Sequence, residues 1–259
     1  MKLVQKWGSV EEDIFGNAVC PTNRESLGRA AELAVVRVSD LPETLQMAKR
    51  GEALVNQVTK VVTAILDALE ITPHEFVGEF SKTSDFRVRH NRTMAEGTFE
   101  LKVYSDLNAR VCPNVCGQGN RGFLKEVVSA IQPPPDKMTE DFFKTFVFEN
   151  QCHVVNTMWK MMFKDENLGI AAKTQSGFSY YAIHGSKARD LNFSSSSLAL
   201  NHNDRTWGGV MSVDIVHNGS LRLAHCQWVR NGINFRFYLP GMLQLIKPAI
   251  VKCGHCDCG

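Results

Sequence analysis

Apolar residues recur along this chain with two periods, three to four residues in some segments and two residues in others. The longer period is clearest at these positions: Leu54, Val58, Val61, Ile65 and Leu69. It predicts a long amphipathic helix. The period of two runs from Phe86 to Ser105 and predicts strand. By contrast, Met1 to Val38 mixes charges, turn residues and a few apolar positions, and we expect irregular structure there.

Two local signals divide the first half of the chain further. Thr72 to Glu75 has the form of a capping box with proline at the first helical position, so we expect a short helix from Phe76 to Phe80. Three consecutive prolines, Pro133 to Pro135, cannot continue a helix and form a stiff spacer. We place the domain boundary at these prolines, between an N-terminal module of residues 1–132 and a C-terminal module of residues 136–259.

The C-terminal module has the clearest pattern. Val210 to Leu239 reads as a three-stranded antiparallel meander whose turns are Asn218-Gly219 and Asn231-Gly232. Upstream of it, a run with helical periodicity begins at Cys152. The predicted fold class is therefore α+β. The N-terminal module is mixed and largely helical, and in the C-terminal module a helix that carries a cysteine packs on a small antiparallel sheet that carries a histidine.

Cys152 and His225 are the candidate catalytic residues. A thiol at a helix start lies at the positive end of the macrodipole, which favours the nucleophilic thiolate. His225 lies in the middle strand of the meander, where a stiff sheet could hold it as a general base within reach of the sulfur. The structural alternatives are a small apolar residue packed at a helix start and a buried histidine. His217, at the hairpin turn, is the second candidate for the base.

The segment from Cys152 to Gly259 resembles papain-like cysteine proteases, and more closely the helper-component proteinases of potyvirus-like plant viruses. In that family a cysteine opens a helix, a histidine follows on a strand about as far downstream as His225, and the chain ends soon afterwards at a glycine. The chain also resembles in size the small first product of the second polyprotein of bymoviruses.

The resemblance implies a papain-like C-terminal module and a Cys152/His225 dyad with no third catalytic residue. It also implies self-cleavage in cis after Gly259, the cleavage-site residue, which would release the chain from its polyprotein. It implies no cofactor, and the host cell cytoplasm as the location. The N-terminal module would then have an accessory role toward RNA or toward host or vector proteins.

Composition narrows the choice of partners. The chain has 259 residues, 44% of them hydrophobic, and a formal net charge of +2, so bulk charge does not demand a nucleic-acid partner. No apolar run reaches 18 residues, so no membrane partner is expected. Residues 1–9 have no long apolar stretch and do not read as a signal peptide.

A second function hypothesis rests on cysteines and basic residues. Cys253, Cys256 and Cys258 surround His255, and with Cys112 and Cys116 they offer enough thiolates for a structural zinc ion. The alternative is free thiols on a flexible tail. Basic residues also crowd before the strand region: Arg87, Arg89, His90 and Arg92. They read either as a nucleic-acid patch or as a solvated strand face. Together these features suggest a zinc-stabilised RNA-binding protein, such as a viral silencing suppressor, without catalytic activity.

Overall fold

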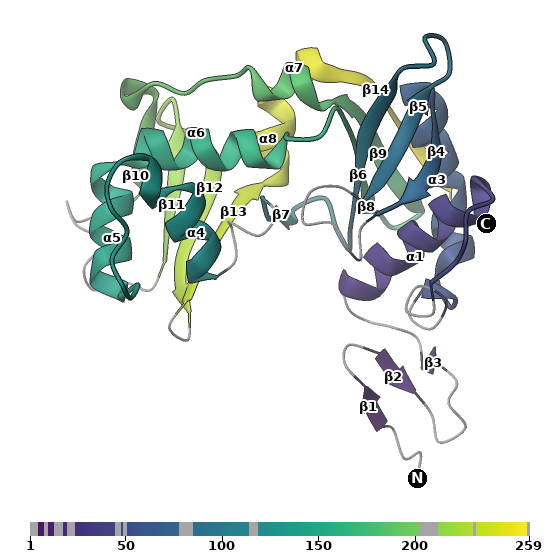
Figure 1. Cartoon of the computed structure of the whole chain (residues 1–259), viewed down its shortest axis with the longest axis horizontal. Coiled ribbons are helices and arrows are strands. Elements are labelled where there is room, and N and C mark those ends of the chain that lie inside the picture. Colours follow the sequence, from purple (N-terminus) through teal and green to yellow (C-terminus); the bar gives the residue numbers. More distant parts are fainter. Residues whose placement is uncertain are drawn as a thin grey trace. The chain divides into compact units, whose positions relative to one another are not determined.

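The chain folds into two compact units, each assembled from separate stretches of sequence (Figure 1). In this computed structural model, the described residues are 5–7, 10–12, 18–19, 24–44, 48, 51–77, 85–113, 119–201, 212–229 and 232–257. Unit 1 comprises Met1–Leu107, Asp165–Ser186 and Pro248–Gly259, and unit 2 comprises Asn108–Lys164 and Lys187–Lys247. The structure thus divides the chain elsewhere than expected, because Pro133 to Pro135 lie inside unit 2. A stiff proline segment marks a boundary in sequence, but units are defined by contacts between distant segments.

Unit 1 contains a sheet with the strand order β14-β9-β8-β6-β5-β4. Its strands are β4 (Ile71–Phe76), β5 (Phe86–His90), β6 (Glu96–Tyr104), β8 (Asn167–Lys173), β9 (Gly177–His184) and β14 (Ile250–Asp257). β6 and β8 run parallel, and the other neighbouring strands run antiparallel. Unit 1 also includes the short strands β1 (Gln5–Trp7), β2 (Val10–Glu12) and β3 (Ala18–Val19), which pair with one another.

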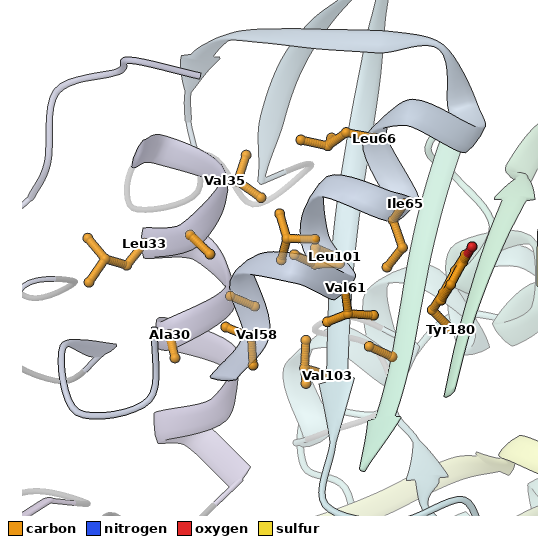
Figure 2. Close-up of a cluster of buried hydrophobic side chains, with 14 of the residues drawn as sticks. Ala30, Leu33, Val35, Val58, Val61, Ile65, Leu66, Leu101, Val103 and Tyr180 are labelled. Carbon is orange, nitrogen blue, oxygen red and sulfur yellow. The ribbon is translucent and has the colours of Figure 1, made fainter. Parts of the chain in front are cut away.

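Two helices, α1 (Arg24–Val38) and α3 (Val55–Leu69), pack on one face of the larger sheet of unit 1 (Figure 2). The predicted stripe of α3 is confirmed, and Val58, Val61 and Ile65 are fully buried in this core. The packing is close: a Cβ added at Gly169 on β8 would stand 2.8 Å from Ile65 Cγ2. At this position the sheet approaches the helix too closely to accept even a methyl group without displacing its neighbours.

α1 corrects the expectation of irregular structure before residue 38. The helix buries small and medium apolar residues, including Ala30, Ala34 and Val35. Alanine favours helix but contributes weakly to a hydrophobic stripe, so the periodicity is faint in the sequence.

The helix expected after Thr72 is also wrong, because Ile71–Phe76 forms strand β4. α3 ends at Leu69, and the next residue, Glu70, has a φ of 54° that turns the chain directly into this strand. β4 is an edge strand of the sheet, and Pro73 lies where the register between β4 and β5 shifts. A residue without an N–H is tolerated at such a position. Pairing with β5 thus overrides the local capping signal. The remainder of the expected helix, from residue 78 onward, lies outside the described residues.

Unit 2 contains a sheet with the order β10-β11-β12-β13-β7. Its strands are β7 (Arg110–Val111), β10 (Leu198–Asn201), β11 (Ser212–His217), β12 (Leu221–Val229) and β13 (Gly232–Tyr238). The predicted meander is therefore confirmed. Asn218 and Gly219 have φ values of 49° and 75°, as a type I′ turn requires. Asn231, in the second predicted turn, lies outside the described residues.

The helices of unit 2 are α4 (Asn120–Glu126), α5 (Glu140–Glu149), α6 (Gln151–Met162), α7 (Gly185–Arg189, which begins in unit 1) and α8 (Leu239–Leu245). Two of them, α5 and α6, cover one face of this second sheet. Short 3₁₀ turns occur at Val128–Ala130, Ser195–Ser197 and Lys247–Ala249. From α5, the Phe143 ring lies 6.0 Å from that of Trp228 on β12, and from α6 the Trp159 ring lies 5.3 Å from that of Phe237 on β13. These contacts define the helix-covered face of the sheet.

The α+β class is confirmed by these elements. Among the residues that the structure describes, no helix is both long enough and apolar enough to cross a membrane.

Candidate functional site

Cys152 is the second residue of α6, as the helix periodicity predicts. Its half-buried thiol donates to the backbone carbonyl of Phe193 at 3.0 Å. One turn further along, the Asn156 amide donates to the Cys152 sulfur at 3.3 Å and to the Phe193 carbonyl at 3.0 Å. The side-chain oxygen of Asn156, Oδ1, accepts the Phe193 N–H at 2.8 Å. Asn156 therefore fixes the thiol against the backbone at Phe193.

His225 lies in the middle of β12, opposite Asp214 on β11 and Arg236 on β13. Its imidazole is only 10% exposed, and its Nδ1 lies 2.8 Å from an Asp214 carboxylate oxygen. The same carboxylate accepts the Tyr238 hydroxyl at 2.7 Å and the Arg222 guanidinium at 2.7 Å. His225 is thus part of a polar network on the sheet, with Asp214 at its centre.

Burial and hydrogen bonding set the charges in this network. Burial lowers the pKa of His225, and the hydrogen bond to Asp214 only partly opposes that effect. For Asp214, burial acts to raise the pKa, but hydrogen bonds from His225, Tyr238 and Arg222 outweigh it and the pKa is lowered. At neutral pH we therefore expect an ionised Asp214 and a neutral His225. The imidazole then donates its Nδ1 proton to Asp214 and carries a lone pair on Nε2.

The structure does not bring Cys152 and His225 together. α6 packs on the sheet through Trp159 against Phe237, and Phe237 pairs with Ala224. Paired residues share a face, and neighbours along a strand point to opposite faces. His225, next to Ala224, therefore points away from the helix-covered face. No hydrogen bond joins Cys152 to His225 in the described part of the chain, so the expected dyad is not formed here.

His217, the second candidate for the base, lies on the helix-covered face. Phe193 packs on Trp159 of α6, with 5.2 Å between the ring centres, and His217 contacts Phe193 from β11. The His217 ring is nearly perpendicular to that of Phe193, with 5.5 Å between their centres. Since the Phe193 carbonyl accepts the Cys152 thiol, Phe193 contacts both the candidate nucleophile and an imidazole.

The tail cysteines do not form a metal site in the described residues. Cys256 pairs with buried Phe178 and faces the core, where its thiol is 4.0 Å from the Lys60 carbonyl. Cys253 is exposed, and its odd spacing from Cys256 along β14 places it on the opposite face. No group of three or more potential metal-ligating side chains occurs among the described residues. Cys116, Cys258 and the predicted cleavage residue Gly259 lie outside them.

The basic residues before β6 are matched by carboxylates. Arg87 pairs with Glu75 at 3.0 Å, Arg89 with Glu96 at 3.0 Å, His90 with Glu166 at 3.9 Å, and Arg92 with Glu70. A nucleic-acid patch needs positive charge that is available to phosphates. The pairing therefore favours the reading of this run as a solvated strand face.

Sequence reasoning missed Asn156 and Asp214, the two residues that organise these clusters. Asn156 had a detectable signal, because it lies one helical turn after Cys152 and so shares its side of the helix. Asp214 had no such signal in the sequence, because its pairing with His225 depends on an irregular strand register. Comparisons with family models, with curated proteins and with solved structures find no match to this chain.

Proposed function

We propose that the chain is a cysteine endopeptidase in which Cys152 is the nucleophile and His217 is the base. The observation that carries this proposal is the shared face. The thiol of α6 and the imidazole of β11 both lie on the helix-covered side of the unit 2 sheet, and Phe193 contacts both of them. His225 lies on the other side, so we assign it to the network around Asp214 rather than to catalysis.

The proposed chemistry follows from the donors and acceptors of the site. The Phe193 carbonyl now holds the thiol but cannot take its proton, so the backbone at Phe193 must move aside when a substrate enters. His217 then removes the thiol proton, and the sulfur attacks the substrate carbonyl carbon. The carbon–nitrogen bond breaks, the imidazolium protonates the leaving amine, and water hydrolyses the thioester to restore the thiol.

The substrate that we propose is the chain's own polyprotein, cut in cis after Gly259, as the resemblance to helper-component proteinases implies. Tethering would give the cleavage segment an effective concentration that no separate substrate reaches. No accessory cofactor is needed for this chemistry, because a thiol and an imidazole supply the nucleophile and both proton transfers.

The experiment is translation of a precursor that extends beyond Gly259 into a reporter domain. We expect Cys152→Ala, Cys152→Ser and His217→Ala precursors to stay uncut, whereas His225→Gln and the exposed-thiol control Cys253→Ser should be processed. Amide NMR spectra would verify that each variant folds. Normal processing of Cys152→Ala would refute the peptidase proposal. A folded His225→Gln that fails, beside an active His217→Ala, would instead refute the choice of base.

A further inference from the structure

A pocket of about 510 Å³ opens in unit 2, beside the Asp214 network and separate from Cys152. The residues that line it are Asn108, Arg110, Ser220, Leu221, Arg222, Tyr238, Pro240 and Gly241. They come from β7 and the segment leading into it, the β11–β12 turn, β12, β13 and the start of α8. Two of them, Arg222 and Tyr238, also bond to Asp214, so the network forms one wall of the pocket.

Two guanidinium groups meet at one aromatic ring in this pocket. The Arg222 guanidinium carbon lies 4.3 Å from the centre of the Tyr238 ring, and that of Arg110 lies 5.4 Å from it. Both distances are within the range of cation–π attraction. Two positive groups repel each other, so either a fixed counter-charge or an anion that binds between them would stabilise an arrangement that gathers them.

The Asp214 carboxylate supplies a fixed counter-charge to only one of the two arginines, Arg222. Asp214 accepts both the Nε and the Nη2 of Arg222, at 3.0 and 2.7 Å, and so fixes the plane of that guanidinium. The Nη1 end of Arg222 has no hydrogen bond within the described residues. Arg110 has no carboxylate partner in the described part of the chain. The pocket therefore retains one uncompensated positive charge and several unused N–H donors.

We propose that this pocket binds a small organic anion whose carboxylate or phosphoryl group lies between Arg110 and the Nη1 end of Arg222. Guanidinium groups match the geometry of both kinds of oxyanion. The apolar part of the ligand would lie against Leu221 and Pro240, and the Ser220 hydroxyl would offer one further hydrogen bond. Asp214 acts here as a positioning residue, since it orients Arg222 and does not touch the ligand.

The structure of α8 limits how the pocket can change. A Cβ added at Gly241 would stand 2.2 Å from the Arg222 carbonyl oxygen, so the helix start lies directly against β12. The helix start that carries Pro240 therefore packs directly on the strand that carries Arg222, which brings these two sides of the pocket together.

The test is calorimetric titration of the full chain with phenyl phosphate and with benzoate, and with benzyl alcohol as the neutral analogue. We expect saturable binding of at least one anion and none of the alcohol, and the tighter anion identifies the preferred group. Arg110→Gln should weaken binding about ten-fold or more, the value of one charge-assisted hydrogen bond. The control Arg121→Gln removes an equal charge from an exposed position in α4, outside the pocket, and should leave the affinity unchanged.

Two results would overturn the proposal. One is the absence of saturable binding by either anion. The other is an equal loss of affinity in Arg110→Gln and Arg121→Gln, which would mean that the anions respond only to overall charge. Because neither result involves Cys152 or His217, failure here leaves the peptidase proposal standing, and the reverse also holds.

Discussion

Asp85 gives unit 1 a pH dependence that can be measured. Its carboxyl group lies just before β5 and accepts the Leu101 N–H at 3.1 Å. Burial, with Glu100 and Glu32 nearby, raises the pKa of Asp85 to about 8. Lys102 opposes the shift but is already paired with Glu100 at 2.6 Å, in a contact whose side chains are 16% and 11% exposed. The folded protein therefore holds a proton that the unfolded chain releases near its ordinary pKa of about 4.

The sign of the effect follows from this difference. A raised carboxyl pKa contributes stability at low pH, and that stability is lost as the pH rises toward the folded-state pKa of about 8. Over that window the free energy of unfolding should fall by about 1.4 kcal/mol per pH unit, or roughly 3 kcal/mol between pH 5.5 and 8. Asp85→Asn should remove this contribution, because the amide does not titrate and its oxygen can still accept the Leu101 N–H.

The assay is urea unfolding followed by the amide NMR signals of β6 and β8, which report on unit 1 alone. Wild type and Asp85→Asn are compared at pH 5.5, 6.5 and 8, so other titrating groups cancel in the difference. The control Asp67→Asn removes an exposed carboxylate from α3 and should keep the wild-type slope. If Asp85→Asn also keeps that slope, the assignment of a proton to half-buried Asp85 is wrong.

Two further substitutions test contacts in unit 2: the hydrogen bonds between Asn156 and Phe193, and the packing of Gly241 against β12. Asn156→Ala should lower the free energy of unfolding by about 2 kcal/mol, because it leaves the backbone carbonyl and N–H of Phe193 with fewer partners. Urea unfolding followed by tryptophan fluorescence would measure this loss. A loss below about 0.5 kcal/mol would mean that these hydrogen bonds do not hold Phe193 in place. Gly241→Ala should lower the melting temperature through its clash with the Arg222 carbonyl, at a cost of about 1–3 kcal/mol. Its matched control, Gly28→Ala in α1, has no neighbour within 4 Å and should stabilise by up to about 1 kcal/mol; equal effects in the two variants would refute the clash.

The parts of the fold that the sequence predicts are those fixed by local periodicity. The stripe on α3 and the meander around Asn218 can be recognised because each segment buries one face against whatever covers it. Segments whose conformation depends on a distant partner are missed. β4 carries a helix-start signal at Thr72 yet pairs with β5, and the unit boundaries arise from contacts between separate stretches of chain.

The partner of His225 could not be predicted for a similar reason. An ideal two-residue turn at Asn218-Gly219 would pair Asp214 with Leu223. Instead, His217 pairs with Leu221, and a bulge between Ile215 and Val216 shifts the register again, so that Asp214 meets His225. A two-residue shift keeps the face but changes the neighbour. The network around Asp214 therefore depends on an irregularity that no pattern of apolar residues records.

The choice between His225 and His217 rests on which face of the sheet α6 covers. A strand in the middle of a sheet presents its residues alternately to both faces, so the sequence shows that His225 and Ala224 point to opposite sides but not which side meets the helix. The Trp159–Phe237 contact fixes this, since Phe237 pairs with Ala224. A rigid sheet cannot turn one residue over without exposing the whole row of apolar side chains beside it. For His225 to reach Cys152, either α6 or the strand would have to leave its packing. His217 already lies on that face and contacts Phe193, whose carbonyl accepts the Cys152 thiol, and that difference is why the two histidine variants are the decisive comparison.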